Sequence, residues 1–158
     1  METAKELADR FREVFLHGTW IANTNYQDQL NKVNRVEAIK SLDNLNSIAA
    51  LTFHIHYYLE GVFQVLEGGP LSIRDQYSFD MPPLQTEEDW EKLRQKLLVQ
   101  AEKIASRIEM LSQPELEQVF VDPKYGSYRR NLEALIEHAY YHLGQISLIR
   151  KLLKERSA

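Results

Sequence analysis

The stretch LIEHAYYHLGQI (residues 135–146) has the spacing of a helix with one buried face. Its apolar residues recur in steps of three and four, and the pattern extends on both sides, from about Ser127 to Lys154. With Ala139 at the centre of the stripe, the residues on the same face are large and aliphatic: Leu132, Leu135, Ile136, Leu143, Ile146 and Leu153. The stretch therefore predicts a long amphipathic helix that packs against other helices.

The rest of the chain shows three more segments with helical periodicity. They cover residues 3–17, about 42–67, and 86–111. Between them, residues 26–40 carry short helical fragments, and residues 117–121 (EQVFV) alternate like a short strand or hairpin arm. All five prolines fall between the long segments, where they break no helix. The sequence is that of a mainly helical protein.

The number and length of these segments predict an all-α fold, a four-helix bundle. About 18 residues separate the second and third helices, more than a tight antiparallel turn needs. We therefore expect a long crossover connection along the bundle, with the second and third helices parallel. With 158 residues and no internal repeat, the chain is expected to be a single domain over residues 1–158.

Composition and charge exclude several classes of function. A net charge of −4 without a clustered basic surface argues against nucleic acid as a partner. No run of about 18 apolar residues is present that could span a membrane. The absence of cysteine excludes a cysteine nucleophile, a cysteine–zinc site and an iron–sulfur cluster. The charged start METAKELADR lacks the apolar core of a signal peptide, so a cytoplasmic location is expected.

His138 and His142 are four residues apart in the last predicted helix and lie at one edge of its apolar stripe. Two histidines at this spacing project together and can bind one ion at nitrogen–zinc distances of about 2.0–2.1 Å. The alternative is a pair of partly exposed polar residues at a seam between helices. The pair alone does not distinguish the two interpretations.

A third histidine, on the second predicted helix, favours the metal site. His54 and His56 face nearly opposite directions, and His54 is the one on the apolar face. Ala50 and Gly61 share that face and are so small that we expect a cavity beside His54. His56 lies on a mixed face and is expected to be solvated or to contact a neighbouring element. Three imidazoles from two helices would leave one coordination position open for water or substrate.

Two familiar metal motifs are excluded by the residues around the histidines. Ala139 follows His138 at the position where a zincin helix has the catalytic glutamate. No glutamate lies three residues before His54, His138 or His142, as di-iron bundles require. The three-nitrogen donor set suits zinc or nickel, with iron(II), cobalt or manganese as alternatives.

The segments SIAALTFHIHYYLEG (residues 47–61) and LIEHAYYHLGQI together resemble the DinB-like (YfiT-like) family of metal-dependent four-helix bundles. The resemblance covers nearly the whole chain in helix order and length. It implies a metal site made of His54, His138 and His142, the same three residues that the helical faces bring together. Some members of this family are thiol transferases that use bacillithiol or mycothiol, and others are described as hydrolases. No basic cluster that would hold an anionic thiol cofactor is evident here.

Further residues complete the hypothesis. Tyr58 shares the face of His54, and Gln145 follows His142 by three residues, so both are candidates for binding a cofactor or substrate. The segment 72–86 (SIRDQYSFDMPPLQT) is a candidate cover for a pocket. We expect a hydrolase or thiol transferase that acts on an unidentified small molecule, and a homodimer is plausible for this family. The alternative is a non-catalytic bundle that binds a ligand or another protein and keeps a vestigial metal site.

Overall fold

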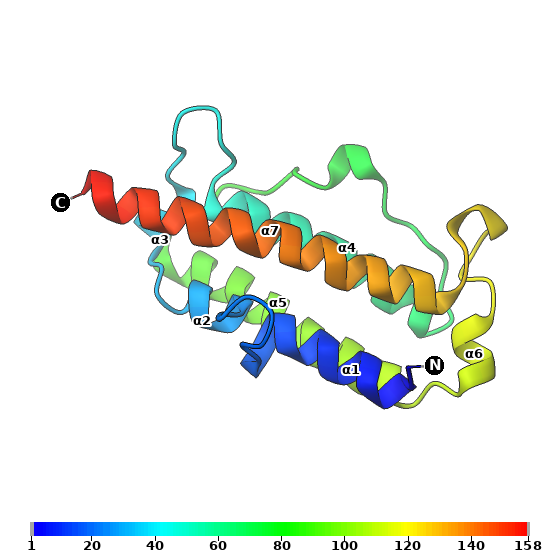
Figure 1. The fold of residues 1–158 in the computed structure, drawn as a ribbon. Helices are drawn as coiled ribbons and strands as arrows, with labels where there is room; N and C mark the ends of the chain where they lie inside the picture. Colours follow the sequence, from blue (N-terminus) through cyan, green and yellow to red (C-terminus); the bar gives the residue numbers. More distant parts are fainter. Residues whose placement is uncertain (1, 158) are drawn as a thin grey trace.

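The computed structural model describes residues 2–157, and its regular structure is helical (Figure 1). Within that range no strand forms, and the all-α class is confirmed. The elements in chain order are α1 (Ala4–Arg12), the π-helical turn η1 (Glu13–His17), α2 (Tyr26–Leu30), α3 (Arg35–Ile39), α4 (Ile48–Leu66), the 3₁₀ turn η2 (Asp75–Tyr77), α5 (Glu87–Glu109), α6 (Gln113–Glu117), the 3₁₀ turn η3 (Pro123–Tyr125) and α7 (Tyr128–Arg156).

The long helices begin where hydroxyl side chains cap them. Thr3 and Thr86 each form a complete capping box, at the start of α1 and of α5. Ser47 and Ser127 accept a hydrogen bond from the backbone of the first turn of α4 and of α7. The predicted starts of the first, third and fourth long helices are therefore confirmed.

The structure differs from the prediction in one helix boundary and in one expected strand. The second long helix begins at Ile48 and not near Leu42, because Asp43 has a left-handed backbone (φ 49°) and the chain turns before Ser47 caps the helix. Residues 117–121 form no strand, since only an isolated bridge joins Val119 to Ser127. The bridge does not extend into a strand because α6 ends at Glu117, just before Val119, and α7 begins at Tyr128, just after Ser127.

The four long helical segments lie side by side (Figure 1). Helix α4 packs against both α5 and α7, and α1 packs against α5. After α4 ends, the connection of residues 67–86 passes back along the molecule before α5 begins (Figure 1). This connection carries η2 and lies on the same side of the molecule as α4 and α7. It therefore passes close to the helices that carry the predicted metal ligands.

One continuous core of apolar side chains joins these helices. Trp90 of α5 is fully buried, and its indole nitrogen donates a hydrogen bond to the Val33 carbonyl at 2.8 Å. The predicted stripe of α7 is buried along its whole length, from Leu132 to Leu153. The core therefore fixes the rotation of α7 about its axis, and with it the direction in which the flanking histidines point.

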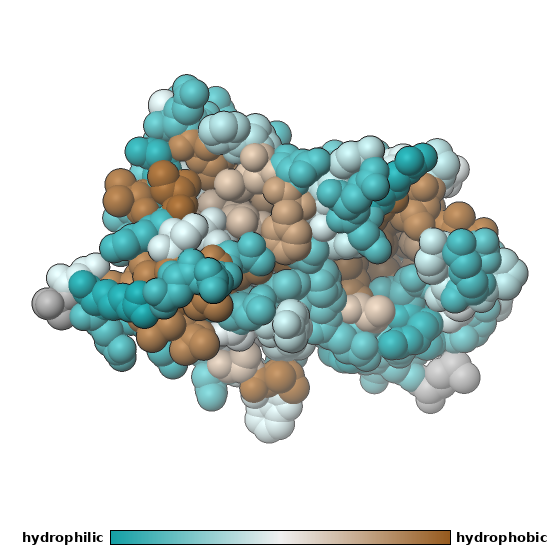
Figure 2. All heavy atoms as spheres, turned by 90° about the horizontal axis from the view of Figure 1, so that it is seen from above, coloured by the Kyte–Doolittle hydropathy of each residue, from teal (hydrophilic) through white to brown (hydrophobic). Residues whose placement is uncertain are grey.

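On the face seen in Figure 2, patches of hydrophobic residues lie between hydrophilic ones. The most exposed large apolar side chains include Trp20 and Val36. Among the described residues, no helix combines the length and the hydropathy needed to cross a membrane.

Candidate metal centre

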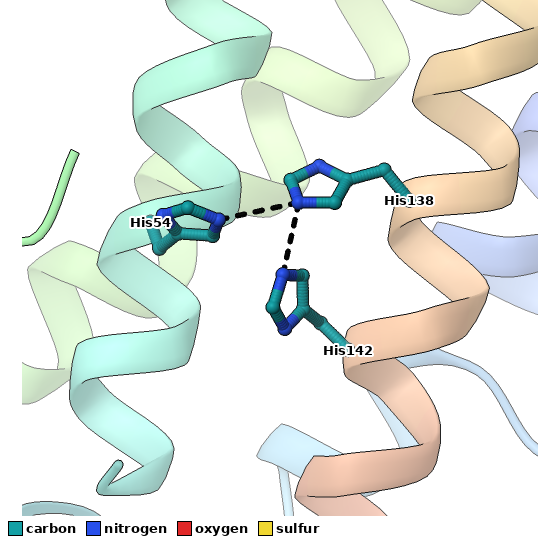
Figure 3. A group of neighbouring side chains, drawn as sticks. All are labelled: His54, His138 and His142. Carbon is teal, nitrogen blue, oxygen red and sulfur yellow. Dashed lines mark hydrogen bonds between the residues drawn. The ribbon is translucent and has the colours of Figure 1, made fainter. Parts of the chain in front are cut away.

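Three histidines meet between α4 and α7 (Figure 3). Nε2 of His54 lies 3.2 Å from Nε2 of His138, and Nε2 of His142 lies 2.9 Å from the same atom. One nitrogen from each ring falls within 4.8 Å of the other two. In residues 2–157 this is the group of histidine and acidic side chains close enough to hold one ion. We call it the three-histidine cluster.

Burial favours the neutral form of all three rings. His54 and His142 are buried, each with 7% of its surface exposed, and His138 is half-buried. Burial, together with the two neighbouring imidazoles, lowers the pKa of His138 to about 4. The pKa of His54 is also lowered, by burial and by His142, against the opposing effects of the Ser78 backbone and Asp75. Near neutral pH the cluster therefore presents neutral imidazoles, the form that binds a metal.

Gln145 determines which ring nitrogen of neutral His142 carries the hydrogen. Its amide oxygen Oε1 lies 2.6 Å from Nδ1 of His142. Because an amide oxygen only accepts hydrogen bonds, Nδ1 of the neutral ring carries the proton. Nε2 of His142 then has a lone pair that points into the cluster, toward Nε2 of His138. A partner on the outer ring nitrogen of this kind orients metal-binding histidines in many proteins.

The geometry of the cluster fits a small divalent ion. Two nitrogens bound to one tetrahedral zinc at about 2.0–2.1 Å lie about 3.3 Å apart. The separations of 3.2 Å and 2.9 Å from His138 differ from this by a few tenths of an ångström, and the nitrogens of His54 and His142 lie within 4.8 Å of each other and would adjust around the ion. The donor set is three imidazole nitrogens without a carboxylate, which favours zinc, nickel or another first-row transition metal over magnesium or calcium.

The connection between α4 and α5 covers one side of the cluster. The ring of Phe79 stacks on His54, with ring centres 4.1 Å apart and planes 12° from parallel. Tyr58 packs edge-on against His54 and His138, and its hydroxyl donates to Asp75 at 2.8 Å. Tyr57, one residue earlier, donates to the carbonyl of Arg74 and accepts from its amide nitrogen. The segment predicted to cover a pocket therefore lies against the cluster, held to α4 by two tyrosines.

Gly61, one of the two small residues expected to leave a cavity beside His54, leaves no open space. A Cβ atom at Gly61 would lie 2.5 to 2.7 Å from three side-chain carbons of Ile73. The space left by the glycine is thus filled by the connection, which comes close to α4 at this point. The sequence pattern could not show this, because the segment that supplies Ile73 has no helical or strand periodicity.

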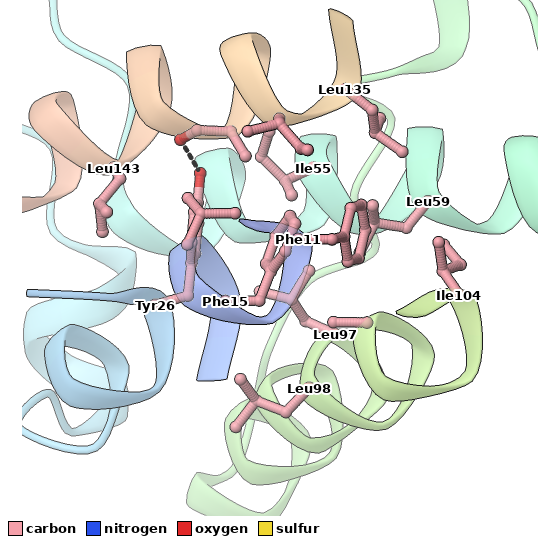
Figure 4. Close-up of a cluster of buried hydrophobic side chains, with 14 of the residues drawn as sticks. Phe11, Phe15, Tyr26, Ile55, Leu59, Leu97, Leu98, Ile104, Leu135 and Leu143 are labelled. Atoms are coloured by element: carbon pink, nitrogen blue, oxygen red, sulfur yellow. Dashed lines mark hydrogen bonds between the residues drawn. The ribbon is translucent and has the colours of Figure 1, made fainter. Parts of the chain in front are cut away.

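The core beneath the cluster holds α7 in place (Figure 4). The hydroxyl of Tyr26, from α2, donates a hydrogen bond of 2.8 Å to the carbonyl of Ala139. Ala139 lies between His138 and His142 on the chain, so this bond anchors the helical turn that carries both ligand candidates. Tyr26 is fully buried, and burial raises its pKa, which keeps the hydroxyl a donor.

The other two histidines lie outside the cluster, as predicted for His56. His56 is half-buried and lines a separate hollow between α4 and α5, where Glu60 and Lys96 also lie. It therefore contacts a neighbouring element, one of the two alternatives expected for it. His17 is exposed at the end of η1.

Comparison with known families agrees with this geometry. A model of the DinB superfamily matches residues 25–146, more than half of the chain. The chain belongs to the DinB superfamily. Neither the curated proteins nor the solved structures contain a match to it. The DinB match includes all three histidines of the cluster and ends just after Gln145, whereas α1 and η1 precede it.

Proposed function

We propose that this DinB protein holds one divalent metal ion, zinc or nickel, with His54, His138 and His142. The observation that carries the proposal is the convergence of three imidazole Nε2 atoms from two helices. The outer nitrogen of His142 is already occupied by Gln145, which supports the same assignment. Three protein ligands leave an open coordination position, as catalytic zinc sites do.

The bound ion would supply Lewis-acid chemistry, by polarising a substrate carbonyl or by lowering the pKa of a bound water or thiol. The chain's own residues prepare the site for this chemistry. Gln145 keeps the proton of His142 on Nδ1, and Phe79 and Tyr58 shield the rings from water on the side of the connection. In this proposal Tyr58 and Gln145 shape and orient the centre.

Hydrolysis of a small uncharged substrate is the activity that the electrostatics favour. Asp75 is the charged group outside the cluster that affects the pKa of a cluster histidine: its carboxylate raises the pKa of His54. An anionic thiol cofactor would need a cationic neighbour at this position. Thiol transfer, which the family resemblance implies, is the second candidate.

We also propose that the whole chain is one domain with the four-helix-bundle architecture of DinB proteins, with residues 67–86 as the crossover. Two observations support this architecture: the side-by-side packing of α1, α4, α5 and α7, and a core shared by all four. A homodimer and a cytoplasmic location stay predictions from the sequence.

Metal analysis of tag-free protein tests the proposal. After reloading and desalting, the wild-type chain is expected to retain one equivalent of zinc or nickel, and His138→Ala much less. His56→Ala is the matched control, because His56 is a half-buried histidine on α4 outside the cluster, and it should bind metal like the wild type. Equal loading of all three proteins would refute the metal site.

Activity distinguishes an enzyme from a metal-binding protein without catalysis. Metal-loaded protein is expected to hydrolyse small neutral esters or amides, and His142→Ala to lose this activity. Stoichiometric metal without hydrolysis or thiol transfer would favour the alternative, a bundle that binds a ligand or a partner through a non-catalytic ion.

A further inference from the structure

A cavity of about 320 Å³ lies next to the three-histidine cluster, between the loop before α4 and the second half of α7. It is lined by the amides and aliphatic side chains Asn44, Leu45, Asn46, Leu51, Gln145, Leu148 and Ile149. Its volume is at the lower end of the range for small-molecule sites. The side chain of Gln145 therefore contacts the ring of His142 and also forms part of the cavity wall.

The chemistry of the lining is unusual for a surface hollow, because none of these residues carries a charge. Three primary amides supply both donors and acceptors, and four aliphatic side chains supply apolar walls. The hollow beside His56, by contrast, is lined by Glu60, Asp89, Lys92 and Lys96. A charged ligand would lose its hydration in the uncharged cavity without gaining an ion pair there. The lining therefore selects an uncharged ligand.

The amide of Gln145 has donors that its contact with His142 does not use. The oxygen Oε1 is committed to Nδ1 of His142, and within residues 2–157 the nitrogen Nε2 makes no hydrogen bond. An amide nitrogen carries two hydrogens, so the group in the cavity that complements it is an acceptor such as a carbonyl oxygen. Because Oε1 and Nε2 belong to one planar group, the contact with His142 also fixes the direction of these donors.

The loop that closes the cavity is held in place from both ends. Asp43 takes a left-handed backbone conformation, and its carboxylate pairs with Arg156 of α7 at 2.9 Å. At the other end, Ser47 caps α4 through the amide nitrogen of Ala50. The wall formed by residues 44–46 is thus positioned before any ligand arrives, which lowers the entropic cost of binding.

We propose that this cavity is a binding site for a small uncharged molecule that carries a carbonyl group and a short aliphatic group, such as an amide or ester. The carbonyl accepts from Nε2 of Gln145, and the aliphatic group packs against Leu51 and Ile149. The imidazole of His142 separates Gln145 from the centre of the cluster, so the carbonyl is held and does not react there. The site goes beyond the proposed metal function and requires no metal.

Titration of metal-free protein, followed by amide and methyl NMR signals, tests this site. N-Butylacetamide is the probe, with hexanoate and hexylammonium as charged molecules of similar length. We expect saturable shifts at residues 44–46, Gln145 and Ile149 with N-butylacetamide, at about millimolar affinity for a ligand of this size. Both charged probes should bind at least about tenfold more weakly.

Gln145→Glu is the decisive variant. A carboxylate of the same length still accepts from Nδ1 of His142 but has no hydrogen to donate, so affinity for N-butylacetamide should fall about tenfold. Gln118→Glu makes the same chemical change in a different hollow, near α6, and should bind the probe like the wild type. Leu148→Trp is an independent variant, since its half-exposed side chain can grow into the cavity without disturbing the core and should abolish binding.

Three results would overturn the proposal: no saturable shifts around the cavity, equal binding of the three probes, or unchanged affinity in Gln145→Glu and Leu148→Trp. The metal hypothesis is tested separately, because His138→Ala leaves the lining of the cavity intact. If that variant loses metal and still binds N-butylacetamide, both proposals stand. If the wild type binds the probe but no metal, only the metal site fails.

Discussion

The imidazole of His142 uses both of its nitrogens, and this separates it from an ordinary buried histidine. Nδ1 is paired with Gln145, while Nε2 lies 2.9 Å from Nε2 of His138, which in turn lies 3.2 Å from Nε2 of His54. Nδ1 of His54 is buried and meets no partner with good hydrogen-bond geometry in the described residues, although the backbone of Ser78 is near enough to raise the pKa of the ring. A buried polar group without a partner is costly in a purely structural role. This nitrogen is not the one that faces His138, so an ion bound at Nε2 would not itself supply the missing partner.

Tyr26→Phe tests how firmly the turn with the two α7 histidines is anchored. The substitution keeps the ring in the core and removes one hydrogen bond to the Ala139 carbonyl. We expect the free energy of unfolding to fall by about 1 kcal/mol, with the fold retained. Urea unfolding provides the measurement. Tyr141→Phe, at a side chain that is 65% exposed, should change stability very little; a similar loss in both variants would contradict the anchoring role.

The sequence predicted the three cluster residues because their spacing along two helices defines their direction. Counting faces placed His54 inward, His56 outward, and the α7 pair at one edge of a stripe, and the structure has this arrangement. Phe79 and Ile73 could not be assigned in this way. Both lie in a connection without periodicity, so their contacts with α4 depend on the path of the chain and not on local spacing.

At the scale of the elements, the connection of residues 67–86 is a packed part of the structure. Tyr57 and Tyr58 hold it to α4 by hydrogen bonds, and Ile73 fills the space above Gly61. The starts of α1, α5 and α7 were predictable because capping residues mark them chemically. The start of α4 was placed too early because the left-handed turn at Asp43 interrupts the chain before Ser47, and the spacing of apolar residues does not reveal a turn of this kind.

Gly61→Ala tests the close packing of the connection. The added methyl group would overlap with the side chain of Ile73, which must then move away from α4. We expect a loss of about 1–3 kcal/mol in stability, the usual cost of overpacking. Gly144→Ala is the matched control in α7: its methyl group would meet nothing within 4 Å, and it should stabilise the helix by about 0.5–1 kcal/mol.

The double variant Gly61→Ala with Ile73→Ala isolates the contact between the two residues. Shortening Ile73 removes the atoms that the new methyl group would meet, so the two changes should cost less together than the sum of their separate effects. Strict additivity in thermal or urea unfolding would mean that Ile73 does not fill the space over Gly61 in solution.

For the molecule as a whole, the cluster makes stability depend on pH. The pKa of His138 is about 4 in the folded protein, against an ordinary value of 6.5. Above pH 6.5 both states are neutral and the group has no effect. Between 6.5 and 4 the unfolded chain takes up the proton more readily, so stability falls as the pH falls through this window. The pKa values of His54 and His142 are lowered too, which adds to the same trend.

Urea unfolding of metal-free protein between pH 7 and pH 5 measures this effect. The free energy of unfolding should decrease over that range in the wild type and less steeply in His138→Gln, which has no group to protonate at that position. Identical pH profiles for the two proteins would show that His138 is not shielded from water as its burial indicates.

Two of the three ligand candidates are close in sequence and the third is distant, and this affects the order in which a metal site would form during folding. His138 and His142 come within reach of each other as soon as one helical turn forms, whereas His54 is 84 residues away from His138. An ion present during folding would therefore meet a two-coordinate site first, on a nascent α7. It would acquire its third ligand only when α4 docks against α7, so completion of the coordination shell would report the pairing of these two helices.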